Sequence, residues 1–295
     1  MKTLTKNILG AFGLQGRQWL DELFKVITIL AKDWSLSDLR PVENMTWHYV
    51  AKGQMNHSKP IVLKIGCDKK TIQDEYHALS HFNGYGCIKL LDFNFTYNAL
   101  LLEQATPGDL LKQTDTLTFN EKITHYAKVI NQLANHPLPQ NHPFKSVNYW
   151  LRALDKLALP IFTPPLIAKA QELRAKLLKT QKAVYLCHGD LHLENIINQQ
   201  NSWLAIDPKG IIGEIGFEAA AFDLISEEEL NNKELNCTEI ILERVAMLAN
   251  SLNIDFNRLL SWIFIRVMLS AQWFVEDGGD PTFMLSLAKL IHSLL

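Results

Sequence analysis

The spacing of apolar and polar residues divides the chain into segments of different expected structure. Residues 1–33 carry apolar side chains at intervals of three and four, which predicts helix. Residues 36–102 are dominated by short apolar runs, which predict strands with one inserted helix. Beyond residue 109 the helical spacing returns, except near residues 184–206, where short apolar runs reappear. The pattern predicts an α+β protein whose strands lie mainly in its first third.

The apolar runs near residues 184–206 flank the most polar loop of this region. Val184–Cys187 is short, apolar and partly β-branched, as expected of a buried strand. The loop His188–Asn195 follows, and two further apolar runs around a turn-rich segment then predict a hairpin. Because a hairpin folds its second strand back along the first, we expect Asp207 to return to the neighbourhood of Asn195.

Three residues of this region have the chemistry of phosphoryl transfer. Mg²⁺ prefers oxygen ligands, and Asn195 and Asp207 supply two of them. Asp190 then remains to orient a substrate hydroxyl and to accept its proton. The alternative interpretation is a polar loop with a capping Asp and a turn Asn.

Three neighbouring residues are expected to support this chemistry. His188 and His192 flank Asp190 and are expected to shape its loop through hydrogen bonds. Lys209 follows Asp207 and is expected to contact phosphate, where it would offset the negative charge that builds up during transfer. A solvent-facing Lys209 is the alternative.

The order of these residues resembles a known family. The pattern His-Gly-Asp-x-His-x-x-Asn, followed by a hydrophobic strand and an Asp, resembles the catalytic and metal loops of the aminoglycoside phosphotransferase superfamily, small-molecule relatives of protein kinases. Residues 203–214 and 16–23 are similar to the streptomycin and hydroxyurea phosphotransferase subfamily. The resemblance spans nearly the whole chain and is densest between positions 184 and 224.

The resemblance implies a two-lobed, protein-kinase-like fold. Residues 1–105 are expected to form a small nucleotide-binding lobe with an antiparallel sheet, preceded by a helical extension over residues 1–34. Residues 106–295 are expected to form a larger, mainly helical lobe for catalysis and substrate binding. The turn-forming run Thr106-Pro107-Gly108 marks the division.

The N-terminal lobe contains a lysine in an otherwise apolar strand. Lys64 lies within residues 61–66, where burial is costly without an anionic partner. The following helix, for which Thr71 is the expected N-cap, carries Glu75 in its first turns. Kinases pair a strand Lys with a helix Glu to hold nucleotide phosphates, so Lys64 and Glu75 are the expected pair. Asp74 is the other candidate for the partner of Lys64. The alternative to any such pair is a Lys64 exposed to solvent and a Glu75 on the surface with no connection to it.

Two further features concern the nucleotide. The extended segment after residue 102 offers main-chain groups, and adenine is expected to hydrogen-bond near Glu103 and Ala105. A plain surface connection would occupy the same place. No glycine-rich motif precedes Lys64, and the first predicted hairpin contains Glu43–Trp47 instead. The absence of a protein-kinase phosphate loop favours a small-molecule acceptor over a protein.

Composition sets limits on location and partners. A net charge of −2 and a pI near 6.6 argue against nucleic-acid binding. The chain shows neither a signal-peptide pattern nor an apolar run long enough for a membrane span, and its four cysteines lack metal-ligand spacing. We therefore expect a cytoplasmic enzyme that acts neither on nucleic acid nor at a membrane. The oligomeric state is not set by the sequence.

The acceptor pocket is the least determined part of the site. Aminoglycosides are polycations, so carboxylates are expected to gather around the acceptor, and an aromatic ring can stack on a sugar or guanidinium. The candidates for these contacts are Glu218, Asp223, Trp273, Glu276 and Asp277. Solvated acidic faces are the alternative, and Glu218 and Asp223 have a second one, bracing the catalytic loop.

Together these observations predict an ATP- and Mg²⁺-dependent phosphotransferase that moves the γ-phosphate to a small-molecule hydroxyl. The resemblance to the streptomycin phosphotransferases makes a streptomycin-like aminoglycoside the preferred candidate for the acceptor. This acceptor would imply a role in antibiotic resistance. The alternatives are a kinase for another hydroxylated metabolite, such as an amino alcohol, a sugar or homoserine, and a nucleotide-binding pseudokinase. GTP in place of ATP stays open.

Overall fold

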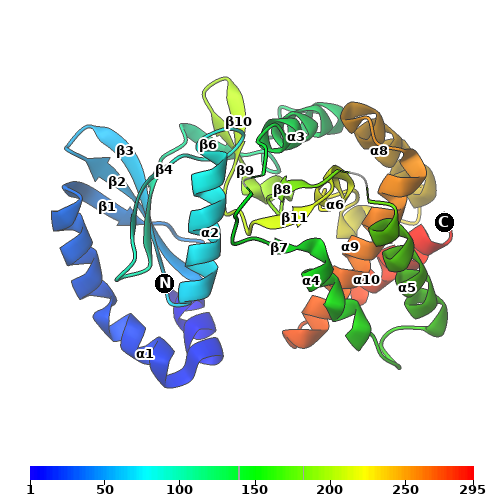
Figure 1. Cartoon of the computed structure of the whole chain (residues 1–295), viewed down its shortest axis with the longest axis horizontal. Coiled ribbons are helices and arrows are strands. Elements are labelled where there is room, and N and C mark those ends of the chain that lie inside the picture. The colour runs from blue at the N-terminus through cyan, green and yellow to red at the C-terminus, as the bar shows by residue number, and fades with distance from the viewer. Residues whose placement is uncertain (139, 182) are drawn as a thin grey trace. The chain divides into compact units, whose positions relative to one another are not determined.

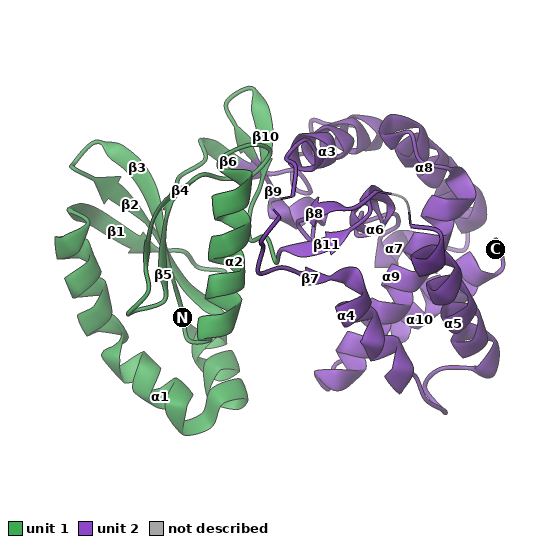
Figure 2. Cartoon of the chain, in the orientation of Figure 1, with its two compact units in different colours: residues 1–108, 198–209 green, residues 109–197, 210–295 purple. Residues whose placement is uncertain are grey.

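A computed structural model describes residues 1–138, 140–181 and 183–295 (Figure 1). The chain forms two compact units (Figure 2). Unit 1 contains residues 1–108 and 198–209, and unit 2 contains residues 109–197 and 210–295. The chain passes from one unit to the other three times: within strand β6 (Pro107–Leu110), within strand β9 (Ile196–Gln199), and between Lys209 and Gly210.

Unit 1 is built on a five-stranded antiparallel sheet of order β1-β2-β3-β5-β4. The central strand β3 pairs Lys64 with Val50 on one side and with Leu100 on the other. Directly paired residues of antiparallel strands point to the same face, so Val50 and Leu100 share the face of Lys64. The strands are β1 (Leu36–Pro41), β2 (His48–Met55), β3 (Lys59–Gly66), β4 (Leu90–Asn94) and β5 (Ala99–Glu103).

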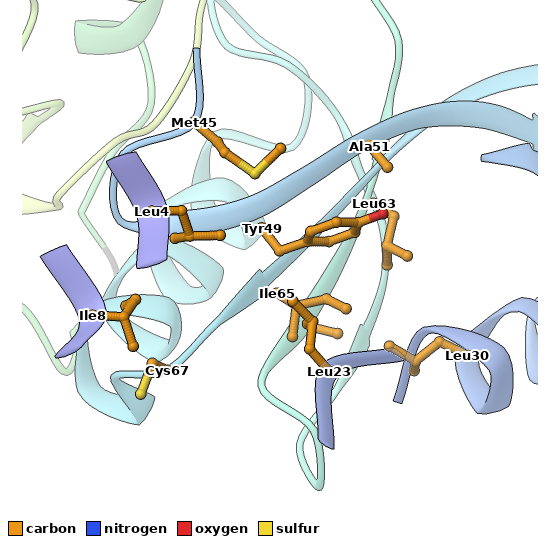
Figure 3. Packing of buried hydrophobic residues seen from close by; sticks show 11 residues of the cluster. Leu4, Ile8, Leu23, Leu30, Met45, Tyr49, Ala51, Leu63, Ile65 and Cys67 are labelled. Carbon is orange, nitrogen blue, oxygen red and sulfur yellow. The ribbon is translucent and has the colours of Figure 1, made fainter. Parts of the chain in front are cut away.

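Helix α1 (Lys2–Asp33) covers the opposite face of this sheet. Its backbone leaves helical geometry at Gly13, with φ 51° and ψ −121°, so α1 consists of two segments. Leu63 and Ile65, which alternate with Lys64 along β3, are buried in one cluster with residues of α1 (Figure 3). The sheet therefore has a fully apolar side and a side that carries the lysine.

Helix α2 (Lys69–Phe82) packs near the lysine side of the sheet. The structure corrects the predicted N-cap, because Asp68 occupies that position and its carboxylate accepts from the N–H groups of Lys70 and Thr71. A carboxylate three residues upstream of Thr71 satisfies the first amides and shifts the start of the helix to Lys69. The helix ends at Asn83, which adopts the left-handed conformation.

Unit 2 is mainly helical, which confirms the expected fold class. A parallel and an antiparallel pairing join three short strands in the order β7-β11-β8. The strands of this sheet are β7 (Lys145–Ser146), β8 (Tyr185–Cys187) and β11 (Ile211–Gly213). A further short sheet has the order β10-β9-β6, and its strand β10 (Ser202–Ala205) belongs to unit 1. The helices are α3 (Phe119–Ala134), α4 (Val147–Leu151), α5 (Pro164–Lys179), α6 (Ile215–Ala219), α7 (Glu227–Asn231), α8 (Cys237–Leu252), α9 (Phe256–Glu276) and α10 (Thr282–His292), with 3₁₀ turns at Arg152–Lys156 and Leu193–Asn195.

Helix α9 is the core helix of unit 2. It is apolar nearly all round, and Trp262, Phe264 and Met268 on it are completely enclosed. Among the described residues, it is the one helix long and apolar enough to cross a membrane, but 72% of that stretch is buried inside the fold. Burial of this kind is typical of a core helix. In its middle, α9 carries one buried arginine, Arg266.

Candidate functional site

Unit 1 contains a buried lysine between two carboxylates. Lys64 Nζ lies 2.9 Å and 2.7 Å from the two carboxylate oxygens of Glu75, and 3.0 Å from Oδ1 of Asp207. Lys64 and Glu75 are 3% and 4% exposed, so the pair is shielded from water. Asp74, the other candidate for the partner of Lys64, pairs instead with Lys70 on the solvent side of α2. The structure thus shows the expected pair of Lys64 and Glu75, and it adds Asp207, which the sequence had named only as a metal ligand.

Electrostatic interactions favour the charged forms of Lys64 and Asp207. Burial alone lowers the pKa of Lys64, but the carboxylates of Asp207 and Glu75 outweigh burial and raise that pKa above its ordinary value. Desolvation opposes ionisation of Asp207, yet Lys64 and Lys209 hold the pKa of that carboxyl well below its ordinary value. Burial raises the pKa of Glu75, against the attraction of Lys64. The lysine and Asp207 are therefore both ionised at neutral pH.

Asp207 reaches Lys64 through the hairpin that the sequence predicted. Strand β10 ends at Ala205, whose N–H donates to the carbonyl of Gly86 and whose carbonyl accepts from the N–H of Ile88, both at 2.8 Å. These bonds fasten the end of the hairpin beside the segment that follows α2. Two residues later, the backbone of Asp207 takes a left-handed turn with φ 62°, which directs its carboxylate toward the lysine.

Residues of the segment after β5 differ in whether their main-chain groups are already used in hydrogen bonds within the protein. Glu103 is engaged on both sides, because its N–H donates to the carbonyl of Lys89 and its carboxylate accepts from the N–H of Lys89. Thr106 exchanges hydrogen bonds with Gln199 and Gln200. Within the described residues, the amide and carbonyl of the buried Ala105 take part in none of these bonds. Hydrogen bonding of adenine to the main chain near Glu103 and Ala105 stays a prediction. Ala105 is the better candidate, because the N–H of Glu103 already binds Lys89.

In unit 2, Asp190 lies in a tightly bonded loop between β8 and the 3₁₀ turn before β9. The side-chain Nδ2 of Asn195 donates to the carbonyl of Asp190 at 2.8 Å, and the N–H of Asp190 donates to Nδ1 of His188 at 3.2 Å. Gly189 adopts φ 89°, and a Cβ there would lie 2.7 Å from the ring of Trp150, so only glycine fits. Local hydrogen bonds thus fix the backbone of the loop at Asp190.

Arg266 of α9 holds Asp190 from outside the loop. Its Nη2 donates to Oδ1 of Asp190 at 3.0 Å, and its Nη1 donates to the carbonyl of Gly189 at 2.7 Å. The guanidinium is 7% exposed and lies over the rings of Phe217 and Trp273. Sequence reasoning missed this residue. The available signal was the one that identified Lys64, a single cation inside an apolar run, which must find an anionic or carbonyl partner when buried.

Two acidic candidates brace the catalytic loop. The carboxylate of Glu218 accepts from the N–H of Gly189 at 3.1 Å, and Oδ2 of Asp223 accepts from the N–H of Leu193 at 2.9 Å. Burial raises the pKa of Glu218 to about 7, although the N–H of Gly189 and the charge of Arg266 act in the opposite direction. These contacts correspond to the structural alternative considered for both residues.

A pocket of about 310 Å³ opens beside Asp190 within unit 2. Asp190, His192, Asp223 and Arg266 are its charged or titratable lining residues. Its remaining wall is largely apolar and comes from α9, α10 and residues 220–225, with Phe222, Phe274 and Phe283 as its aromatic members. A small polar end facing Asp190 and an apolar body are typical of pockets for small organic molecules.

The remaining acceptor candidates lie apart from this lining. Trp273 packs edge-on against Trp150, with ring centroids 5.6 Å apart, and its ring also contacts Arg266. Glu276 binds Nζ of Lys156 at 2.9 Å, and Asp277 ends α9 with its N–H bonded to the carbonyl of Trp273. Among the five predicted acceptor residues, Asp223 is the one that lines the pocket. Their roles toward an acceptor stay predictions.

The donor atoms of the predicted metal ligands fit Mg²⁺. Asp207 is ionised, as its lowered pKa shows, and offers a hard carboxylate oxygen. Asn195 is held through its Nδ2, a bond that leaves the carbonyl oxygen of the amide as the group for a cation. Asn195 belongs to unit 2 and Asp207 to unit 1.

Solved structures show that the chain has the fold of kinase-like phosphotransferases. A choline kinase from Streptococcus pneumoniae superposes with a TM-score of 0.66 over 93% of this chain and 100% of its own, at 14% identity. An aminoglycoside phosphotransferase crystallised with AMP-PNP and hygromycin B superposes with a TM-score of 0.64 over 92% of this chain and 97% of its own, also at 14% identity.

The chain belongs to the aminoglycoside/hydroxyurea antibiotic resistance kinase family, whose model matches residues 35–278. It is 30% identical over 277 residues to streptomycin 3''-kinase of Klebsiella pneumoniae, covering 88% of this chain and 97% of that protein. It is 23% identical over 282 residues to hydroxyurea phosphotransferase of Kitasatospora aureofaciens, covering 90% and 77%. The resemblance inferred from the sequence motifs is confirmed, and the protein is a phosphotransferase with a hydroxyl acceptor.

Proposed function

We propose that this enzyme transfers the γ-phosphate of ATP to a hydroxyl of a streptomycin-like aminoglycoside and thereby confers resistance. The single observation that carries the reaction is the placement of Asp190 at the edge of a small-molecule pocket, held there by Arg266. The similarity to streptomycin 3''-kinase along 88% of the chain, and to streptomycin 6-kinases of two Streptomyces species, supports the acceptor.

The proposed roles follow from the contacts within each unit. Lys64, oriented by Glu75, binds the phosphates of the nucleotide as a buried cation. The adenine base hydrogen-bonds to the main chain near Glu103 and Ala105. Asn195 and Asp207 are the oxygen donors proposed for Mg²⁺, which when bound would neutralise phosphate charge. A cytoplasmic location would supply both ATP and the metal.

The chemical step proposed for Asp190 is a proton transfer. Asp190 orients the acceptor hydroxyl and accepts its proton as the oxygen forms a bond to the γ-phosphorus. The bond between that phosphorus and the bridging oxygen of ADP breaks, and ADP leaves. Lys209, which acts electrostatically on Asp207 and Glu75 in unit 1, adds positive charge near the phosphates.

The acceptor is the part of the proposal that needs the broadest test. The purified enzyme is incubated with ATP or GTP, Mg²⁺ and one candidate acceptor at a time, and nucleoside diphosphate release is measured. The panel contains streptomycin and other aminoglycosides, hydroxyurea, choline, simple sugars and homoserine. We expect streptomycin to give the highest kcat/KM and a product heavier by one phosphoryl group.

Other outcomes of the same panel correct the proposal in specific ways. Hydroxyurea is the substrate in the name of a relative that is 23% identical to this chain. Turnover with hydroxyurea alone would change the assigned acceptor but leave the proposed phosphoryl transfer unchanged. Turnover with choline or a sugar alone would do the same. Absence of diphosphate release with every acceptor would contradict the proposed substrate range as a whole.

A further inference from the structure

The first segment of α1 serves no role in the site described above, and it precedes residues 35–278, which match the family. The two segments of α1 are in close contact near the bend at Gly13, as a Cβ on Gly16 would lie 2.6 Å from the carbonyl oxygen of Ile8. This close contact places residues 2–12 against the rest of unit 1 as a defined element. Its buried residues, Leu4 and Ile8, are both fully enclosed.

These residues contact the loop that joins β1 to β2, residues 42–47. Nδ2 of Asn7 donates to the carbonyl oxygen of Thr46 at 3.1 Å. Leu4 and Ile8 share a buried cluster with Met45 of the loop, and Figure 3 shows Leu4 beside Met45. The loop is therefore anchored from the face of the sheet opposite Lys64, by one hydrogen bond and one inserted methionine.

The anchored loop occupies a position that matters for a nucleotide. Strand β2 starts directly after it at His48, which pairs with Gly66, and Val50 pairs with Lys64. In kinases the turn that leads into this strand covers the phosphates and is rich in glycine. Residues 42–47 contain no glycine, so their shape depends on contacts rather than on backbone freedom.

We propose that residues 2–12 hold the 42–47 loop in the shape that binds the nucleotide phosphates, with Asn7 and Leu4 as positioning residues. The inference rests on the proposed nucleotide site beside Lys64. A loop that is already ordered loses less conformational entropy when a ligand binds. If the anchor is removed, a smaller fraction of the enzyme has the competent loop, and the apparent Kd for ATP rises by the inverse of that fraction.

The decisive variants are Asn7→Ala and Leu4→Ala, with Leu30→Ala as the matched control. Leu4 and Leu30 are both fully buried in the same cluster, at opposite ends of α1, and Leu4 is the one beside Met45. We expect Asn7→Ala and Leu4→Ala to raise the Kd and KM for ATP about fivefold, as when one molecule in five keeps the competent loop. The acceptor KM and the kcat at saturating ATP should stay unchanged.

The control separates positioning from stability. Leu30→Ala should lower the Tm as much as Leu4→Ala does but leave the KM for ATP at the wild-type value. An equal rise in KM for both leucine variants would overturn the inference. Hydrogen exchange supplies a second readout, because the amides of residues 42–47 should exchange faster in Asn7→Ala. Asn7 is partly exposed, so this variant remains informative if Leu4→Ala fails to fold.

Failure of this inference is distinguishable from failure of the proposed function. Calorimetric titration of the wild-type enzyme with Mg·ATP tests the nucleotide site by itself, and no binding there would contradict the proposed function. Wild-type binding together with unchanged affinity in Asn7→Ala and Leu4→Ala would contradict only the role of α1. Met45→Ala, which removes the anchor from the loop side, should reproduce the effect of Leu4→Ala.

Discussion

The guanidinium of Arg266 donates to Oδ1 of Asp190 at 3.0 Å, although 76 positions separate the two residues. The same guanidinium binds the carbonyl of Gly189, so one side chain of the core helix α9 fixes both the backbone and the carboxylate of the catalytic loop. Because the middle of α9 is buried, this contact ties the geometry of the proposed base to the packing of unit 2.

Replacement of the proposed base should separate chemistry from binding. Asp190→Asn keeps the size of the side chain and its ability to accept a hydrogen bond from Arg266, but an amide cannot accept the hydroxyl proton. We expect turnover to fall by about 10²–10⁴-fold. Calorimetry should show unchanged ATP affinity. Wild-type-like product formation by this variant would contradict the assignment of Asp190.

Replacement of the arginine should disturb the position of the base. Arg266→Lys keeps the charge but supplies a compact ammonium, which cannot reach both the Gly189 carbonyl and Asp190 in the same geometry. Loss of one charge-assisted hydrogen bond, about 1.5–3 kcal/mol, should lower kcat by roughly tenfold to a hundredfold. The KM for ATP should remain unchanged, which steady-state kinetics can establish.

A second arginine of α9 provides the control for this experiment. Arg258 donates to both carboxylate oxygens of Glu214, at 2.8 Å and 2.7 Å, and contacts neither Asp190 nor Gly189 within the described residues. Arg258→Lys should lower the Tm while leaving kcat near the wild-type value. A similar loss of kcat in both variants would indicate a general effect on unit 2 and would count against positioning by Arg266.

The buried ion pair of unit 1 leads to a prediction about both affinity and stability. Lys64→Met should raise the KM for ATP and also destabilise the protein by about 3–5 kcal/mol, because Glu75 would remain as a buried carboxylate without its cation. Adding Glu75→Gln should restore much of the stability without restoring ATP affinity. Urea unfolding and ATP titration of the single and double variants measure the two effects. Recovered ATP affinity in the double variant would refute the role of Lys64.

Glu218 should make stability depend on pH in an unusual direction. Its pKa is about 7 in the folded protein and 4.5 as the ordinary value, so the folded protein keeps a proton that the unfolded chain loses. The free energy of unfolding should therefore fall as the pH rises from about 4.5 to about 7, by at most about 3 kcal/mol. The contribution is fully present below this window.

Glu218→Gln tests this dependence. The glutamine carbonyl can still accept from the N–H of Gly189, but the side chain no longer titrates. The difference in unfolding free energy between wild type and variant, measured by urea unfolding across the window, should change with pH. A constant difference would show that Glu218 does not titrate between the two values.

Several parts of the site were predictable from the sequence because their chemistry is local. Asp190 and Asn195 are five positions apart in one loop, and the bond between them forms within that loop. Lys64 stood out as a charge inside an apolar strand, and burial required an anionic partner on the neighbouring helix. The hairpin after Asn195 followed from its apolar runs and turn residues.

Other parts depended on which helices and strands pack together. The sequence did not reveal Arg266 as the partner of Asp190, because the two residues are 76 positions apart. For Glu218 the sequence offered two roles, and the fold selected the contact with Gly189, 29 positions away. The sequence also named the wrong N-cap for α2, where a carboxylate at Asp68 competes successfully with the hydroxyl of Thr71.

The sequence by itself determined the reaction class, because the loop of Asp190, the proposed metal ligands and the strand lysine are each short patterns with a direct chemical meaning. Only the tertiary structure decided which side chains hold those groups in place: Arg266 on Asp190, Asp207 on Lys64, and Leu4 beneath Met45. The physical reason is that burial of a charge or an apolar side chain requires a partner but does not specify where in the chain that partner lies.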